Sequence, residues 1–273
     1  LALAENPNGY IMGSGYQLHT PDSLFTALRL GAATVFNPEF PGPFFLLLPM
    51  NTQASIMKAC NLLELPEAPR FTSAACVDLD VYARATELAR SAKAITIKLG
   101  GGARSCGPEV LELAKLLDAV IVPGAKMSGV VPYSAQRCMA VGGSKGSICG
   151  NFAMNEAELA IVIGARAVCQ WDCSGTAWKK AKSVINFNTR AVDAGHYNRS
   201  VALIGDAKQN LRSWIDQLKE AGFSPKTGVS PWLKANMAKK AEWQEFKKLR
   251  FTNPRLFDPV WGREVLTQPA AIE

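Results

Sequence analysis

Between residues 78 and 222, short apolar runs alternate with segments in which apolar residues recur every third or fourth position. The runs hold four to six largely apolar residues, several of them β-branched, which is typical of parallel strands buried on both faces. These runs are 94–99, 119–122, 159–163, 183–187 and 201–204. The segments that predict helices are 80–92, 108–118, 151–156 and 206–222. The alternation predicts an α/β fold built on a doubly wound parallel sheet.

The segments on either side carry less of this pattern. A helix is predicted after Thr20, because Pro21 suits the first helical position, and the apolar run Phe44–Leu48 predicts a strand buried on both faces. Residues 1–19 show few periodic apolar positions and predict a lead-in segment. One helix and one strand are too few for a domain, so other elements must cover that strand. We therefore expect three parts, which are residues 1–70, 71–225 and 226–273.

The sequence AITIKLGGGARSCG at 94–107 places three glycines between a predicted strand and a predicted helix. Such a junction lets backbone N–H groups approach a phosphate at the positive end of a helix dipole. The alternative is a tight turn without a ligand, since the loop lacks the G-x-G-x-x-G spacing and the Lys-Ser/Thr of a P-loop. Gly164–Arg166 and Asn188–Thr189 also follow predicted strands. Because the carboxyl ends of parallel strands meet at one edge, these three loops predict a nucleotide site there.

The net charge of +7 is concentrated in residues 234–250, where lysines alternate with aromatic and aliphatic residues. Basic and aromatic residues together can indicate nucleic-acid binding. Here the apolar residues recur at helix-like intervals, which favours the solvated face of a packed helix. We therefore predict no nucleic-acid partner.

The seven cysteines are odd in number and scattered, and only Cys169 and Cys173 lie close together. A C-x3-C pair without a second pair is a poor zinc signal, so we expect free thiols in a reducing cytoplasm and no metal site. No apolar run approaches the roughly 18 residues that span a bilayer, and no signal-peptide pattern is present, so we predict a cytoplasmic chain with no membrane partner. Because the chain begins with Leu1, we expect a processed chain or a piece of a longer one.

Several separated motifs between residues 78 and 222 resemble one known family. They are AITIKLGGGARSCGPEVLELAKLLDAVIVPGAKMSGVVP, GGSKGSICGNFAMNEAELAIVIGAR, VINFNTRAVDAGHY and IGDA, in this order. Together they resemble the central domain of thiamine-diphosphate-dependent enzymes, a superfamily that includes acetohydroxyacid synthase and pyruvate oxidase. The run SGTAW, with INFNTRAVDAGHY behind it, is closest to the trihydroxycyclohexanedione/cyclohexanedione hydrolase branch. The flanks are similar to the end of the pyrimidine-binding domain and to the start of the pyrophosphate-binding domain.

The resemblance also implies a set of site residues. In this superfamily the central domain either binds FAD or ADP or is a structural remnant without a nucleotide. The positions that match the nucleotide-binding motifs are Gly101, Gly102, Ala103, Gly164, Arg166 and Asn188. Arg166 would pair with phosphate. Asn188 is neutral where the family often has an acidic residue for the ribose hydroxyls, so the remnant without nucleotide stays an alternative.

The resemblance further implies that the thiamine site lies outside this chain. The family holds Mg2+ and the diphosphate with a GDG motif followed by an Asn, and the sequence contains no GDG. We therefore expect no catalytic residue and no metal ligand here. Partner chains with the pyrimidine- and pyrophosphate-binding domains would bind thiamine diphosphate and Mg2+ in an oligomer.

The expected reaction makes or breaks a C–C bond next to the carbonyl of a small-molecule substrate, with hydrolysis of a cyclic dione as the preferred subtype. One alternative is a stand-alone nucleotide-binding or regulatory module. Another is a structural subunit without activity.

Overall fold

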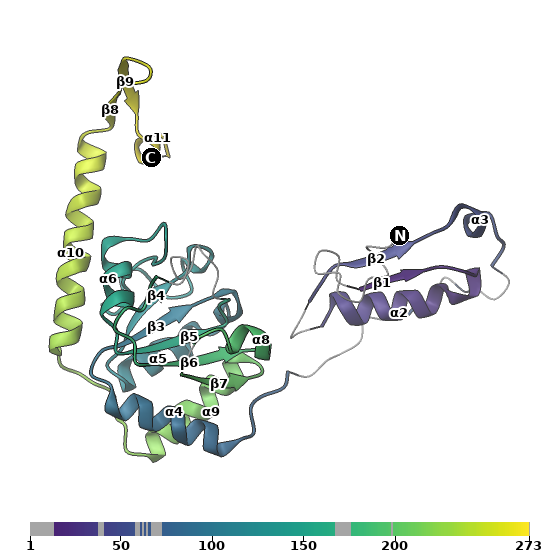
Figure 1. The fold of residues 1–273 in the computed structure, drawn as a ribbon, viewed down its shortest axis with the longest axis horizontal. Helices are drawn as coiled ribbons and strands as arrows, with labels where there is room; N and C mark the ends of the chain where they lie inside the picture. The colour runs from purple at the N-terminus through teal and green to yellow at the C-terminus, as the bar shows by residue number, and fades with distance from the viewer. Residues whose placement is uncertain are drawn as a thin grey trace. The chain divides into compact units, whose positions relative to one another are not determined.

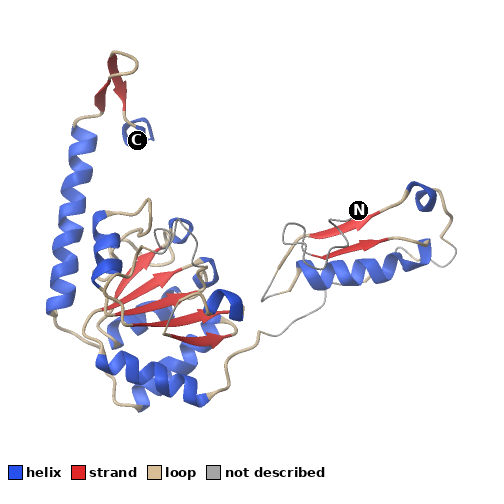
Figure 2. Cartoon of the chain, viewed as in Figure 1, coloured by secondary structure: helices blue, strands red, loops and turns tan. Residues whose placement is uncertain are grey.

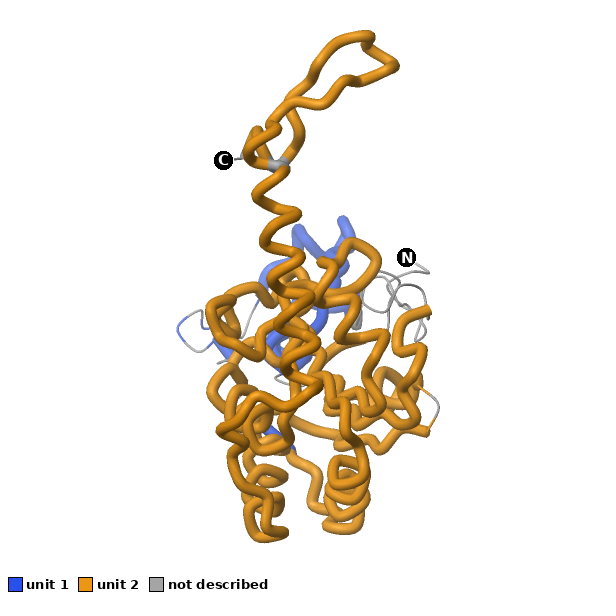
Figure 3. Tube along the Cα trace, turned by 90° about the vertical axis from the view of Figure 1, so that its left-hand side faces the viewer, with its two compact units in different colours: residues 1–74 blue, residues 75–273 orange. Residues whose placement is uncertain are grey.

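The computed structural model describes residues 14–37, 41–57, 61, 63, 65–66, 73–166, 176–197 and 199–272. The chain divides into two compact units, Leu1–Ala74 and Ala75–Glu273 (Figure 3). The three-part division at residues 70 and 225 stays a prediction. We describe the second unit first because it carries the candidate site.

The second unit is built on a five-stranded parallel sheet with the order β4-β3-β5-β6-β7 (Figures 1 and 2). The strands are β3 (Ile95–Leu99), β4 (Val120–Pro123), β5 (Leu159–Ile163), β6 (Ser183–Asn188) and β7 (Ser200–Ile204). Every residue of β3, β4 and β5 is buried, which explains why these strands are rich in apolar residues, although β3 also contains Thr96 and Lys98. The predicted α/β fold with a parallel sheet is confirmed.

Helices cover both faces of this sheet. One apolar core joins one face to α4 (Leu79–Ser91), α5 (Gly107–Leu116) and α9 (Ala207–Glu220). A second core joins the other face to α6 (Ile148–Glu156) and to the start of α10 (Pro231–Thr252). The shorter helices of this unit are η3 (Gly101–Ala103), η4 (Ala125–Met127), α8 (Ala191–Ala194) and α11 (Gln268–Ile272).

The long connection between β4 and α6 closes the outer edge of the sheet. Cys138 forms an isolated parallel bridge with Ile121, and the Ile121 amide donates to Arg137 O at 2.7 Å. Arg137 also reaches the turn before β4, where its Nη1 lies 2.8 Å from Asp118 Oδ1 and donates to Ala119 O at 3.2 Å. The contact with Asp118 is a charge pair rather than an aligned hydrogen bond.

The basic stretch after residue 230 forms a helix, α10, that docks on this same connection. Trp232 Nε1 donates to Ile95 O at 3.0 Å, and Leu233 is fully buried. Lys240 Nζ donates to Tyr133 O at 2.7 Å and lies 4.6 Å from the centre of the Tyr133 ring, on which Lys247 also packs at 4.9 Å. These lysines therefore have structural partners.

Beyond α10 the chain forms an antiparallel hairpin of β8 (Arg255–Asp258) and β9 (Arg263–Leu266). The hairpin exposes large apolar side chains to solvent, including Phe257 at 65% and Trp261 at 65% of their accessible surface. Within the described residues, no helix is both long enough and apolar enough to cross a membrane.

The first unit is a small parallel pair of strands with one main helix. Its elements are β1 (Ser14–Gln17), η1 (Pro21–Ser23), α2 (Leu24–Val35), β2 (Phe44–Leu47) and α3 (Met50–Gln53). β1 pairs in parallel with β2, so the prediction that residues 1–19 are only a lead-in segment is wrong for 14–17. The short SGYQ sequence has no apolar run, and the strand forms because β2 supplies its hydrogen-bonding partners.

β2 differs from the sequence prediction in its burial. All four of its residues are only partly buried, and Leu48 is 45% exposed, so the prediction of burial on both faces is wrong for the described chain. α2 covers one face, where Gly31 packs against the Phe44 ring. The apolar side chains of β2 therefore remain partly accessible to solvent in the described chain.

We predict that Arg137→Ala lowers the free energy of unfolding by about 2 kcal/mol, because it leaves the partly buried Asp118 carboxylate without its charge partner. Urea unfolding followed by far-ultraviolet circular dichroism measures this change. Lys248→Ala is the control, since it removes an exposed ion pair to Glu245 and should leave the midpoint unchanged. Equal midpoints for Arg137→Ala and the wild type would contradict the role given to Arg137.

Candidate functional site

The loops after β3, β5 and β6 meet at the carboxyl edge of the sheet and are joined through their backbones. Gly100 N donates to Ile163 O at 2.8 Å, and Gly164 N donates to Phe187 O at 2.7 Å. The rim continues to the start of α9, where Gly205 N donates to Asn188 O at 2.9 Å. The structure therefore brings the six predicted site residues to one edge.

The glycines of the first two loops are required by the contact between those loops. A Cβ on Gly100 would lie 2.3 Å from Ala165 Cα, and a Cβ on Gly164 would lie 2.4 Å from Gly102 Cα. Gly164 also adopts a φ of +58°, which disfavours other residues. Gly102 N donates to Gly164 O at 3.0 Å. Close backbone packing thus explains these three glycines whether or not a ligand binds.

Gly101 and Arg166 form the open part of the edge. Gly101 is exposed, and a Cβ built on it meets no heavy atom of the described residues within 4 Å. Arg166 is also exposed. Ala103 is fully buried in the core beneath η3 and anchors the turn. A ligand at this edge would therefore approach Gly101 and the Arg166 guanidinium first.

The helix after the glycine loop is separated from it by a short turn. α5 begins at Gly107, after the η3 turn, and Gly107 is buried. A Cβ on Gly107 would lie 2.4 Å from Val130 O, so the connection between β4 and α6 packs on this part of the first turn of α5, whereas Pro108 in the same turn is exposed. Approach of a phosphate to the start of this helix stays a prediction.

Asn188 uses both ends of its side-chain amide inside the protein. Its Nδ2 donates to Ala165 O at 3.0 Å, and its Oδ1 accepts from Thr189 N at 3.1 Å. The side chain is 7% exposed. Asn188 thus ties the end of β6 to the loop after β5, and contact with a ribose stays a prediction.

A group of charged side chains that the sequence interpretation missed lies beside η3. Glu109, in the first turn of α5, accepts from Arg212 Nε at 3.1 Å and lies 3.7 Å from Lys208 Nζ. Lys208 and Arg212 are four positions apart on α9, so their shared helix face was a signal in the sequence. Burial, together with the charge of Glu109, raises the pKa of the nearby Cys106 thiol to about 11, despite a hydrogen bond with Ser105. Cys106 is therefore neutral at physiological pH and is not an activated nucleophile.

The sequence interpretation also missed a buried lysine on β3, Lys98. It is 2% exposed on β3, and its Nζ donates to Gly142 O at 2.7 Å. The lysine therefore fixes the glycine-containing loop before α6 to β3. Its position inside a predicted apolar strand was the available signal.

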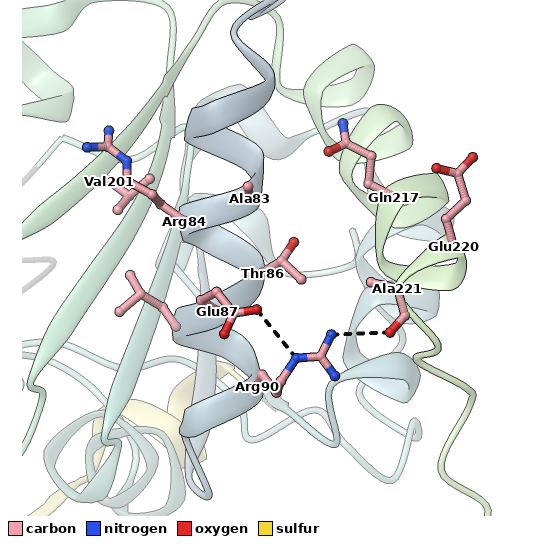
Figure 4. A pocket seen from close by; sticks show the side chains of 10 residues that line it. Ala83, Arg84, Thr86, Glu87, Arg90, Val201, Gln217, Glu220 and Ala221 are labelled. Atoms are coloured by element: carbon pink, nitrogen blue, oxygen red, sulfur yellow. Dashed lines mark hydrogen bonds and ion pairs between the residues drawn. The ribbon is translucent and has the colours of Figure 1, made fainter.

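A groove of about 760 Å3 lies on the opposite part of the unit, between α4, β7 and α9 (Figure 4). Arg90 crosses toward α9, where it donates to Ala221 O at 3.2 Å, and it pairs with Glu87 at 3.5 Å. None of the predicted site residues lines this groove.

In the part of the chain that the structure describes, no group of three or more His, Cys, Asp or Glu side chains could hold a metal ion. Cys76, Cys106, Cys138 and Cys149 are free thiols, whereas Cys169 and Cys173 lie outside the described residues.

Comparison with known proteins identifies relatives of the second unit. Residues 82–214 match the family model for the thiamine pyrophosphate enzyme, central domain. The 3D-(3,5/4)-trihydroxycyclohexane-1,2-dione hydrolase of Listeria innocua serovar 6a is 24% identical over 234 residues, which cover 80% of this chain and 35% of that protein. The acetolactate synthase large subunit of Haemophilus influenzae is 21% identical over 234 residues, which cover 81% of this chain and 38% of that protein.

A second hydrolase of the same name, from Listeria monocytogenes serovar 1/2a, is 24% identical over 74% of this chain and 32% of its own length. The chain thus spans about a third of the length of the curated relatives it matches. The resemblance to this superfamily is confirmed.

We predict that Gly100→Ala and Gly101→Ala differ sharply in stability. The Gly100 substitution drives a methyl group into backbone atoms 2.3 Å away and should cost about 3 kcal/mol or prevent folding. The Gly101 substitution meets open space and should leave the urea midpoint close to that of the wild type. Similar midpoints for the two variants would show that the two loops do not pack backbone against backbone.

Proposed function

Residues 82–214 belong to the central-domain family of thiamine pyrophosphate enzymes, and on this premise we propose that the chain is the central-domain part of such an enzyme. The match of the family model to the unit with the parallel sheet carries this proposal. The proposed reaction makes or breaks a C–C bond next to the carbonyl of a small-molecule substrate. We favour hydrolysis of a cyclic dione, because two of the relatives are named as hydrolases of such a compound.

We assign the binding of thiamine diphosphate and Mg2+ to partner chains. Magnesium needs several oxygen ligands, and among the described residues no cluster of metal-binding side chains is present. The sequence also lacks the GDG motif. The described residues therefore do not fit a Mg2+ site, and we derive no reaction step from them.

Surfaces in both units support the need for partners. In the first unit, a two-stranded parallel sheet carries a helix that covers one face, although parallel sheets are normally covered on both. Met50 and Ile56 are 87% and 83% exposed there. In the second unit, the hairpin β8–β9 exposes Phe257 and Trp261. We propose that chains with the pyrimidine- and pyrophosphate-binding domains cover these surfaces in an oligomer.

The open edge of the sheet supports a second, separate proposal, that the central domain binds FAD or ADP. Gly101 leaves room for close approach of a ligand, and the exposed guanidinium of Arg166 can pair with phosphate. If the chain binds a nucleotide but has no partner, it is a stand-alone nucleotide-binding or regulatory module. If it has partners but binds no nucleotide, the central domain is the structural remnant.

Native mass spectrometry of the tagged chain, purified from its natural host, tests the first proposal. We expect companion chains in the complex and thiamine diphosphate after denaturing release. We also expect the isolated chain to show no C–C cleavage of a cyclic dione, because we assign thiamine diphosphate and Mg2+ to partner chains. Turnover of the substrate by the isolated chain would contradict the proposal. So would material from the natural host that contains neither a companion chain nor thiamine diphosphate.

The nucleotide proposal predicts that Arg166→Gln weakens ADP binding about tenfold, since it removes a charge-assisted contact with phosphate. Isothermal titration calorimetry of the full chain measures the dissociation constant. Lys179→Gln is the control, because Lys179 is an exposed lysine outside the carboxyl-edge loops and the substitution removes the same charge. An equal loss of ADP affinity in both variants would mean that the affinity depends only on the net charge of the chain, and it would contradict the role given to Arg166.

A further inference from the structure

A carboxylate and two cations meet where α5 and α9 pack beside η3. Glu109 lies 3.1 Å from Arg212 and 3.7 Å from Lys208, and its side chain is 9% exposed. α9 packs against the η3 turn that presents Gly101. Lys208 and Arg212 therefore lie next to the open part of the carboxyl edge.

The contact of Glu109 with α9 is not explained as an ion pair that merely stabilises the packing of two helices. Its Oε2 is buried and has no hydrogen-bond partner among the described residues, an arrangement that costs stability. Another ion pair already joins the same two helices, because Lys219 lies 2.7 Å from Glu112, and both of these side chains are about half exposed. Glu109 thus keeps a buried charge beside the loops at some cost.

We propose that Glu109 is a positioning residue that restrains Lys208 and Arg212 and lowers the affinity of the carboxyl edge for polyanionic ligands such as a nucleoside diphosphate. This inference rests on the proposed nucleotide site. With Glu109 present, the three side chains carry one net positive charge, and without its carboxylate they carry two. Glu109 thereby reduces the preference of the edge for ligands with more negative charges.

The test is calorimetric titration of the full chain with ADP and with adenosine, for the wild type and for Glu109→Gln. One extra positive charge beside the carboxyl edge should tighten ADP binding about fivefold at low salt. The adenosine affinity should stay unchanged, and the gain for ADP should shrink at high salt. A purely structural role would not separate the two ligands. Glu112→Gln is the matched control, since it removes the other α5–α9 ion pair and should change neither affinity.

Adding Lys208→Gln and Arg212→Gln to the Glu109→Gln chain should abolish the gain. Unchanged or weaker ADP binding by folded Glu109→Gln overturns the inference and leaves the nucleotide site standing. Binding only by Glu109→Gln supports it, and absence of ADP binding in both proteins overturns the nucleotide site and the inference together. If circular dichroism shows that Glu109→Gln does not fold, the test uses the double variant Lys208→Gln/Arg212→Gln, in which Glu109 is retained. Its ADP affinity must then fall more than its adenosine affinity, and an equal fall overturns the inference.

Discussion

The carboxyl edge of the sheet depends on a contact between two stretches of backbone. The loop after β3 and the loop after β5 approach so closely that no Cβ fits at Gly100 or Gly164. Backbone hydrogen bonds then link this pair to the end of β6 and to the start of α9. Side chains are excluded from this contact, and the residues that remain exposed at the edge include Gly101 and Arg166. The packing of these two loops therefore determines which groups of the edge are accessible to a ligand.

Much of the fold of the second unit was predictable because its strands are buried on both faces. Such strands are rich in apolar residues over several positions, so β3, β4 and β5 are visible in the sequence without any knowledge of their partners, even though β3 also buries Thr96 and Lys98. β1 was not predictable in this way, since the four residues of SGYQ pair with a strand about 30 positions further on. β2 was predicted as a strand but with the wrong burial, because burial depends on what covers the sheet.

For the candidate site, topology predicted the meeting of the loops but not their accessibility. The carboxyl ends of parallel strands must share an edge, so Gly101, Arg166 and Asn188 could be placed together from the sequence. Two details depend on contacts between distant segments, namely the cover that Val130 forms over α5 and the amide bonds of Asn188. No local pattern announces them. The spacing of Lys208 and Arg212 was visible in the sequence, but their contact with Glu109 was not, because Glu109 lies on another helix.

The connection between β4 and α6 has a mechanical consequence. One of its residues, Val130, rests on the first turn of α5, while Tyr133 and Ala135 are gripped through their carbonyl oxygens by Lys240 of α10. Arg137, a few positions later, clamps the same connection to the start of β4. Several contacts thus hold this connection in place, and one of them comes from the helix that leads into the C-terminal hairpin. Through Lys240, the position of α10 is therefore coupled to the segment that packs on the first turn of α5.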